Sequence, residues 1–205
     1  MKVVQCRLLD GNPYPAEGRL DMSCRVCPWW LGYMLINPFR KLMQDPVKIL
    51  SPYVIQGMTV LEPGPGMGFF TIEIARLVGP SGKVVAVDIQ QKMLDALGRR
   101  LDKAGLRDRS VLRLVSDQDL NIDDLAGKAD FALAFAMVHE LPDQQAFFKD
   151  LFKALKPGGR VLFSEPSGHV NNKMFEASIE AAKSCGFAVE SRPVIKRSKS
   201  VVLKK

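Results

Sequence analysis

The sequence predicts an α/β fold built on a doubly wound, mostly parallel seven-stranded sheet, with an antiparallel last strand and an N-terminal helical appendage. Three observations predict it. Apolar, β-branched runs alternate with segments of helical spacing from residue 58 to the C-terminus. Five strand–helix repeats of this kind are typical of a doubly wound sheet. The run at residues 129–137 is almost wholly apolar, which indicates a parallel sheet covered on both faces.

Length and composition agree with a globular chain of this class. The 205 residues are 47% hydrophobic and 25% charged. A chain of this length buries about 70% of its unfolded surface, which suffices for a core without disulfides or a structural metal. No uncharged apolar run reaches the roughly 18 residues that a membrane span needs. The N-terminal residues lack the apolar core of a signal peptide, so we expect no membrane span and a cytoplasmic protein.

The sequence pattern of the chain changes near residue 57. Residues 1–56 are punctuated by proline, and we expect them to form a helical cap or lid segment, whereas residues 57–205 form the sheet domain. Asn37-Pro38 and Asp45-Pro46 each join an N-cap residue to a proline at the first helical position. Two short helices are therefore expected just before the sheet domain.

The elements of the sheet domain follow in regular order. Gly105 is placed to end the second of its helices, and the last two strands are close enough in the chain to pair antiparallel. Ligands of such sheets bind beyond the carboxyl ends of the central strands. The expected strands are residues 59–61, 83–88, 111–115, 129–137, 160–165, 187–192 and 200–203, and the expected helices are 69–78, 91–104, 143–155 and 172–185.

A glycine-rich turn and an acidic residue mark the candidate binding site. Residues 62–68, with the sequence EPGPGMG, follow the first strand and open the first helix. Glycine there allows a sharp turn and a close approach of ligand to backbone. Asp88 stands at the tip of the second strand, twenty residues after Gly68, where a carboxylate can accept both hydroxyls of a ribose. This order predicts a nucleoside-containing ligand.

The details of the turn favour one kind of nucleoside. A dinucleotide fingerprint spaces its glycines as G-x-G-x-x-G, whereas Gly64, Gly66 and Gly68 stand closer together. Pro65 removes an N–H that a phosphate could use, and the charge of Glu62 would repel a pyrophosphate but attract an ammonium or sulfonium group. The sequence therefore favours S-adenosyl-L-methionine. An NAD(P)-dependent oxidoreductase stays the alternative.

At this point the sequence resembles a known family. Residues 60–68 look like the first motif of the class I S-adenosylmethionine-dependent methyltransferases, and residues 85–88 look like their second-strand motif. Ser116-Asp117 is similar to their adenine-side loop, and residues 129–136 and 155–159 are similar to their fourth strand and the turn before the fifth. The resemblance covers residues 58–203 and implies a Rossmann-like methyltransferase fold.

The resemblance also implies a cofactor site. Pro65 departs from the family pattern, which more often has a small residue with a free N–H, and this puts one backbone hydrogen bond in doubt. Gly68 completes the turn. The implied contacts are Glu62, Gly64 and Gly66 at the methionine end, Asp88 at the ribose hydroxyls, Ile89 on the adenine face, Asp117 at the adenine amino group, and the backbone near Ala136 at the amino acid.

The acceptor side is less clearly marked. Methyl transfer needs alignment and exclusion of water, and a base only if the acceptor loses a proton. His139 follows the fourth strand and is a candidate base; the alternative is a positioning histidine that bonds to Glu140 or to the next helix. Glu165, after the fifth strand, is a candidate substrate contact. The Asn/Asp-Pro-Pro-aromatic loop and the Pro-Cys pair of base-modifying nucleic-acid enzymes are both missing here, which favours a small-molecule acceptor.

Three features have two interpretations each. Trp29, Trp30 and Tyr33 would suit a flat or apolar acceptor under a lid, or they pin a helix to the sheet. Cys24-x-x-Cys27 has half the ligands of a zinc site or could bind a thiophilic substrate, but we expect two reduced cysteines and no metal. The basic run from residue 192 onward is expected to be a solvated edge strand; the alternative is a non-catalytic protein that binds RNA there.

Overall fold

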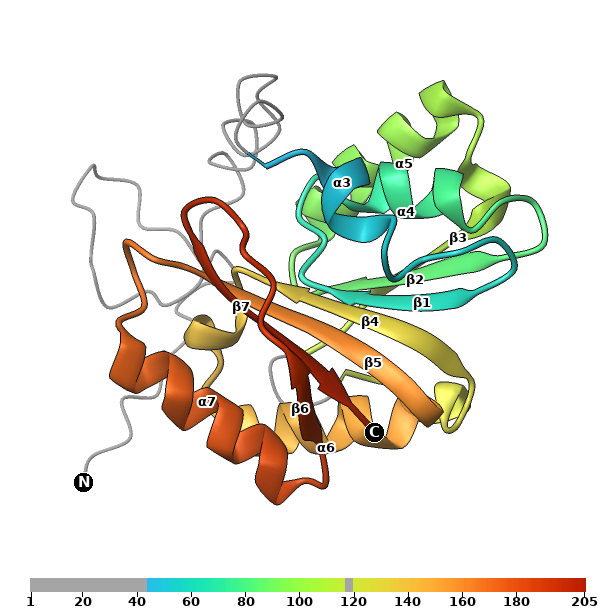
Figure 1. Cartoon of the computed structure of the whole chain (residues 1–205). Coiled ribbons are helices and arrows are strands. Elements are labelled where there is room, and N and C mark those ends of the chain that lie inside the picture. The colour runs from blue at the N-terminus through green and yellow to red at the C-terminus, as the bar shows by residue number, and fades with distance from the viewer. Residues whose placement is uncertain (1–43, 117–119) are drawn as a thin grey trace, which may run out of the picture.

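The computed structural model describes residues 44–116 and 120–205 (Figure 1). They form one seven-stranded sheet with the order β3-β2-β1-β4-β5-β7-β6. Strands β1 to β5 run parallel to one another, and β7 is antiparallel to β5 and β6. The predicted sheet is therefore confirmed. Its strands are β1 (Thr59–Pro63), β2 (Lys83–Asp88), β3 (Ser110–Leu114), β4 (Ala129–Phe135), β5 (Leu155–Pro166), β6 (Ala188–Ser191) and β7 (Ser198–Lys204).

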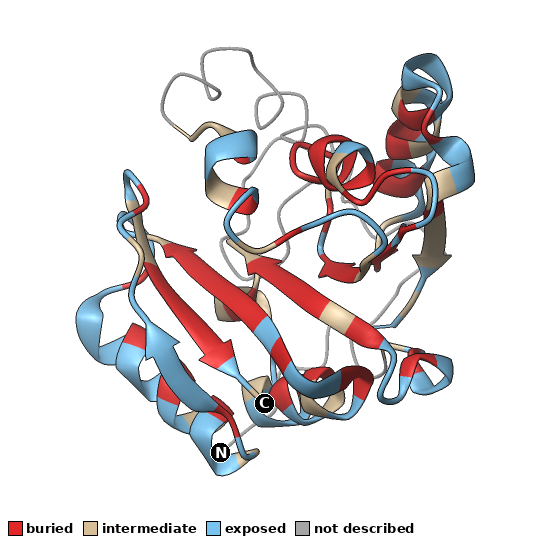
Figure 2. Cartoon of the chain, turned by 45° about the vertical axis from the view of Figure 1, so that its right-hand side comes forward, coloured by how far each residue is buried: buried red, intermediate tan, exposed pale blue. Residues whose placement is uncertain are grey.

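Helices cover both faces of this sheet. The helices α3 (Pro46–Leu50), α4 (Thr71–Leu77) and α5 (Gln91–Ala104) pack on one face, and α6 (Gln144–Ala154) and α7 (Asn172–Ser184) pack on the other (Figure 1). Successive strand residues alternate between the two cores: Val60 packs with α4, while Leu61 packs in the core beneath α6. This explains why the central strands are apolar on both faces over most of their residues, and Figure 2 shows them buried along most of their length.

The helix ends follow the capping residues that the sequence shows. Asp45 Oδ1 accepts hydrogen bonds from the backbone N–H groups of Val47 (3.0 Å) and Lys48 (3.4 Å) at the start of α3. Gly105 ends α5 at a φ of 65°, as predicted. The predicted second short helix is thus confirmed, while the first one, near Asn37-Pro38, lies outside the described residues.

Several predicted boundaries are wrong by a few residues, each for a local reason. The first helix of the sheet domain starts at Thr71 because the glycine turn extends to Gly68, which has a φ of 83°. Strand β4 stops at Phe135 because Ala136 has a φ of 59°. Strand β5 starts early, since Leu155 pairs with Ala129 before a bulge.

The start of the described chain contributes to the core of the sheet domain. Leu50 and Val54 are buried in the same cluster as Val60. Just before them, Gln44 Nε2 donates hydrogen bonds to the Lys196 carbonyl (3.2 Å) and to Ser198 Oγ (3.0 Å). The chain therefore enters the sheet domain beside the β6–β7 hairpin. The remainder of the expected cap, with its tryptophans and its cysteine pair, lies outside the described residues.

The basic C-terminal run is not an edge strand, so that expectation is wrong. Strand β7 lies between β5 and β6, with Val201, Val202 and Leu203 buried. The edge is formed by β6, all four residues of which are exposed (Figure 2).

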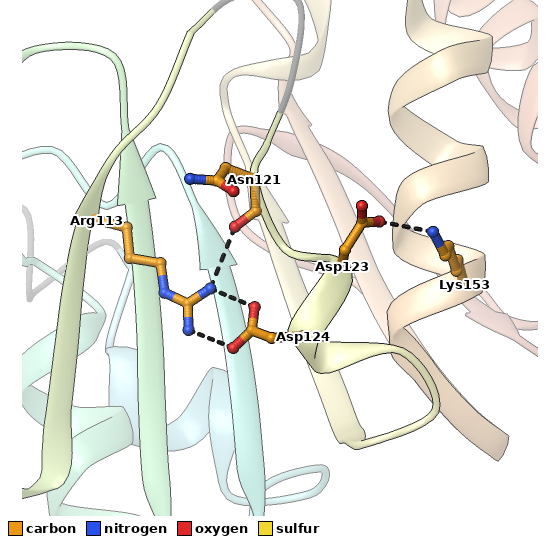
Figure 3. A network of polar contacts seen from close by, with 5 residues as sticks. All are labelled: Arg113, Asn121, Asp123, Asp124 and Lys153. Carbon is orange, nitrogen blue, oxygen red and sulfur yellow. Dashed lines mark hydrogen bonds and ion pairs between the residues drawn. The ribbon is translucent and has the colours of Figure 1, made fainter.

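The described part of the connection between β3 and β4 contains a short 3₁₀ turn, η3 (Asp123–Leu125), and polar contacts hold it on both sides (Figure 3). Arg113 of β3 makes a two-pronged ion pair with Asp124 (2.6 and 2.7 Å) and donates to the Asn121 carbonyl (3.2 Å). Lys153 of α6 pairs with Asp123 (2.6 Å). Surface pairs of this kind contribute at most about 1 kcal/mol each, so their main effect is to fix the path of the loop after β3.

A search of the described helices for a membrane span finds none that is long and apolar enough.

Candidate functional site

The candidate site lies at the carboxyl ends of β1, β2 and β4, where the chain order of the strands reverses between β1 and β4. The glycine turn after β1 has three residues with positive φ: Gly64 (67°), Gly66 (55°) and Gly68 (83°). The Gly64 N–H donates to the Val87 carbonyl of β2 (2.9 Å), and the Gly68 N–H donates to the Pro65 carbonyl (2.9 Å). The turn is thereby held against the tip of β2.

The three glycines differ in what surrounds them. A Cβ on Gly68 would lie 2.3 Å from Cδ1 of Leu97 on α5, and one on Gly64 would lie 3.1 Å from Cγ of Met137. A Cβ on Gly66 would meet no atom within 4 Å. Gly68 therefore serves the packing of the turn on α5, whereas Gly66 borders open space at the site.

We expect this difference to separate folding from ligand binding. Gly68→Ala should lower the free energy of unfolding by about 2–4 kcal/mol, because it adds a clash to an unfavourable backbone conformation. Gly66→Ala should lower it by only about 1 kcal/mol, since its methyl group enters open space, but should weaken the binding of a ligand seated there. Chemical denaturation and calorimetric titration of both variants test this. Equal losses of stability would contradict it.

Asp88 joins the turn to the end of β2. Its Oδ1 accepts from the Gln90 N–H (2.9 Å) and its Oδ2 accepts from the Gly66 N–H (3.3 Å). The side chain is 8% exposed. Burial raises the pKa of Asp88 to about 6, against the opposing effect of these backbone hydrogen bonds. The sequence-predicted acid is therefore beside the glycine turn, with a carboxyl group that a ligand could reach.

Glu62 is the most perturbed acid of the site. It is 3% exposed, and its Oε2 atom is buried without a hydrogen-bond partner. Burial raises the pKa of Glu62 to about 8, against the opposing effect of a hydrogen bond with the Thr71 side chain, and the charge of Asp88 raises it further. A buried polar atom without a partner is costly, so its presence at the mouth of an open turn indicates that a ligand supplies the partner.

The other predicted contacts surround this centre. Ile89 is 39% exposed, although it is apolar, directly after Asp88. Ala136 ends β4 with positive φ, and its N–H donates to the Ser164 carbonyl (2.8 Å). Pro65 is buried within the turn. Asp117, the predicted adenine contact, lies outside the described residues.

On the neighbouring strand ends the structure brings His139 and Glu165 together. Glu165 Oε1 accepts from the His139 backbone N–H (3.0 Å), and Glu165 Oε2 lies 2.6 Å from His139 Nδ1. The hydrogen bond to Glu165 raises the pKa of His139 above its ordinary value. The hydrogen-bond partner of His139 is therefore Glu165 on β5, instead of Glu140 or the next helix, which were the partners expected for a positioning histidine.

Two further residues that sequence reasoning missed shape the turn. Arg100 of α5 donates a hydrogen bond to the Met67 carbonyl, and the Met137 side chain lies against Gly64. Nothing in the spacing of α5 marks Arg100. Among residues 44–116 and 120–205, no group of three or more His, Cys, Asp or Glu side chains is arranged to hold a metal ion.

The residues present fit S-adenosylmethionine. Two carboxyl groups flank a turn whose central glycine leaves its Cβ position open, and one carboxyl oxygen lacks a partner. This donor set suits a ligand with a positive charge and vicinal hydroxyls. A pyrophosphate would bring two negative charges to two acids, which is unfavourable.

Comparisons with known proteins agree with this geometry. A family model described as "Methyltransferase domain" matches residues 55–195. The arsenite methyltransferase of Aquipseudomonas alcaligenes is 29% identical over 159 residues, covering 71% of this chain and 45% of that protein. The demethylmenaquinone methyltransferase of Lactobacillus johnsonii is 31% identical over 166 residues, covering 78% of this chain and 65% of that protein. The chain thus spans between 45% and 65% of the length of these curated relatives.

Among solved structures, a SAM-dependent methyltransferase from Aquifex aeolicus superposes with a TM-score of 0.77 at 22% identity. The match covers 87% of this chain and 99% of that one. At this identity the likeness concerns the fold.

Proposed function

Since the chain belongs to the class I S-adenosylmethionine-dependent methyltransferases, we propose that it transfers a methyl group from S-adenosylmethionine to a small-molecule acceptor. The observation that carries this proposal is the pair of buried carboxyl groups, Glu62 and Asp88, on either side of an open glycine turn. Two curated relatives are named for arsenite and demethylmenaquinone, which are both small molecules. This supports a small acceptor.

Each residue of the site has a proposed role. When bound, the cofactor supplies a methyl group on a positively charged sulfur. Glu62 and the backbone of the glycine turn bind the methionine end, where Glu62 Oε2 gains the partner that it lacks. Asp88 accepts the ribose hydroxyls, and the exposed Ile89 packs on the adenine. Asp117 and the backbone near Ala136 complete the set.

The acceptor is proposed to bind beyond β4 and β5. His139 and Glu165 lie at these strand ends, and Trp29, Trp30 and Tyr33 are proposed to cover the acceptor as part of a lid. The chain enters the described structure beside the β6–β7 hairpin, on the same edge of the sheet as Pro166, which pairs with Ser198. Residue 44, where the described structure begins, therefore lies close to the proposed acceptor side.

The basic C-terminal run gives little support to an RNA-binding function. Arg192 makes a two-pronged ion pair with Glu176 (2.6 and 2.8 Å), and Lys199 Nζ donates to Asn172 Oδ1 (2.6 Å). Lys205 Nζ donates to the carbonyls of Phe152 and Leu155. These cations are engaged within the protein, so fewer of them face a phosphate backbone.

A ligand titration tests the cofactor. S-adenosylhomocysteine at about 100 times its Kd should stabilise the protein by about 2.7 kcal/mol, which raises the Tm by roughly 5–10 °C for a chain of this size. NADH at the same concentration should leave the Tm unchanged. Stabilisation by NADH alone would favour an oxidoreductase. Steep, salt-dependent RNA binding without methyl transfer would favour a binding protein.

A further inference from the structure

The Glu165 carboxylate holds His139 at two points. One oxygen accepts the backbone N–H of His139 at 3.0 Å, and the other lies 2.6 Å from ring atom Nδ1. The Glu165 side chain is 1% exposed, whereas the imidazole is 19% exposed. Because the backbone N–H can only donate, it fixes the carboxylate independently of the ring. The second oxygen therefore stays aimed at Nδ1 whatever the protonation state of the imidazole.

This arrangement decides which ring nitrogen is free. A carboxylate oxygen accepts hydrogen bonds, so the nitrogen beside it carries a proton, and the neutral imidazole then has its lone pair on Nε2. The ring is the exposed member of the pair. It follows β4 in the turn η4 (Val138–Glu140), two residues after Met137, which lies against Gly64. The free nitrogen thus belongs to a residue two positions after one that lies against the glycine turn.

We propose that Glu165 is a positioning residue that keeps a proton on Nδ1, so that Nε2 of His139 accepts the proton of a hydroxyl-bearing methyl acceptor. This inference rests on the proposed function and narrows its substrate class. A neutral hydroxyl is a poor nucleophile unless its proton leaves as it attacks, so a correctly oriented base has a use there. An acceptor that is already an anion, or that has no proton to lose, would gain nothing from this pair.

The step is balanced without any further reactant. A bond forms between the hydroxyl oxygen and the methyl carbon, and the bond between that carbon and sulfur breaks with its electron pair left on sulfur. The hydroxyl proton passes to Nε2. The resulting imidazolium is stabilised by the Glu165 carboxylate and afterwards loses its proton to water.

The charged groups around His139 set the pH range of this step. Glu165 on β5, Glu140 on the same turn and His169 after β5, with its ring centroid 6.0 Å from that of His139, all face it. The hydrogen bond to Glu165 raises the pKa of His139, partial burial lowers it, and the charges of Glu165 and Glu140 raise it. The free base is therefore expected only above the ordinary pKa of histidine.

Nitrogen NMR of the two histidine rings tests the proposal without any acceptor. The chain contains only His139 and His169, so the variant His169→Gln assigns both. In the wild type we expect His139 to titrate above pH 6.5 and, when neutral, to carry its proton on Nδ1. In Glu165→Gln the midpoint should move to lower pH, because the partner that raises the pKa of His139 is lost, and the preference for Nδ1–H should be lost with it. Glu140→Gln, the matched control, should keep that preference. A neutral wild-type ring protonated on Nε2 would overturn the proposal.

A pair of probe acceptors tests the substrate class. With labelled S-adenosylmethionine, Glu165→Gln should slow transfer to 4-methylphenol at least tenfold, in keeping with the loss of a base. Transfer to 4-methylthiophenol, which is largely ionised near pH 8, should stay within about twofold. Equal losses on both probes would assign Glu165 a structural role only. S-adenosylhomocysteine should bind the variant as it binds the wild type, which separates this result from a failure of the cofactor site itself.

Discussion

Asp88→Ala is expected to weaken the binding of S-adenosylhomocysteine by about 30-fold or more. The substitution removes an acceptor that sits at the end of β2 beside Gly66 and is proposed to bind both ribose hydroxyls. Two charge-assisted hydrogen bonds are lost, and a cost of about 2 kcal/mol corresponds to this factor. Isothermal titration of the purified variant measures the effect directly.

The control for this prediction is Asp95→Ala. Asp95 is also an acid on the same side of the sheet, but it is exposed on α5, and its Oδ1 accepts from Gln91 Nε2 (2.7 Å). Its removal should leave the affinity unchanged. Near-normal binding by Asp88→Ala, in a variant whose unfolding transition matches that of the wild type, would exclude the proposed ribose site.

The cofactor side of the site could be predicted from the sequence because it is local. The glycine turn and Asp88 belong to one strand–helix–strand unit, and a parallel crossover must bring the ends of β1 and β2 together. Proximity of the turn to the acid follows from that order alone. Glu62, at the end of β1, was predicted for the same reason. How deeply Glu62 is buried could not be predicted, since this depends on how α4 packs over the strand.

The pairing of His139 with Glu165 could not be predicted in the same way. Both residues follow strands that are neighbours in the sheet, and Phe135 pairs with Ser164, so their general proximity was implied. The contact itself depends on the path of the chain after β4, where Ala136 has a left-handed backbone conformation and residues 138–140 form the η4 turn. A backbone conformation that is unusual for alanine gives no signal in the sequence.

Packing between distant segments was missed for a related reason. Arg113 and Asp124 face each other because the loop after β3 folds back on its own strand, and Arg100 reaches Met67 across the interface of α5 with the turn. Long cationic side chains have many possible partners on a surface. Residue type and spacing predict which face of an element is buried. They do not predict which of several nearby carbonyl or carboxylate groups a cationic side chain will pair with.

The buried carboxyl of Glu62 predicts that the empty protein loses stability as the pH rises. Its pKa is about 8 in the folded chain and near 4.5 in the unfolded chain, so between these values unfolding releases a proton. Stability therefore falls from about pH 4.5 and levels off above about pH 8. The full shift corresponds to roughly 3–5 kcal/mol. Asp88, whose pKa rises to about 6, adds a second decline that ends near pH 6.

Glu62→Gln should remove the upper part of this decline. Denaturant unfolding of the empty variant is expected to show a smaller decline between pH 6 and 8 than that of the wild type, so that the variant is the more stable protein at pH 8. A residual decline is expected from His139, whose pKa is also raised in the folded chain. Glu180→Gln, at an exposed residue of α7 that pairs with Lys183 (2.8 Å), should keep the slope of the wild type. A decline of equal size in Glu62→Gln would show that other groups cause it.

The same substitution should harm ligand binding. The α-ammonium group of the ligand is proposed to bind the ionised carboxylate, so protonation of Glu62 opposes binding. The affinity of the wild type for S-adenosylhomocysteine, which keeps this ammonium group, should therefore rise with pH between 6 and 8. In Glu62→Gln the affinity should be lower and nearly independent of pH in that range. Titrations at pH 6, 7 and 8 measure both effects. A variant that is more stable but binds the ligand more weakly is expected only if the buried carboxyl serves ligand binding. If the carboxyl stabilised the fold, its replacement would destabilise the protein.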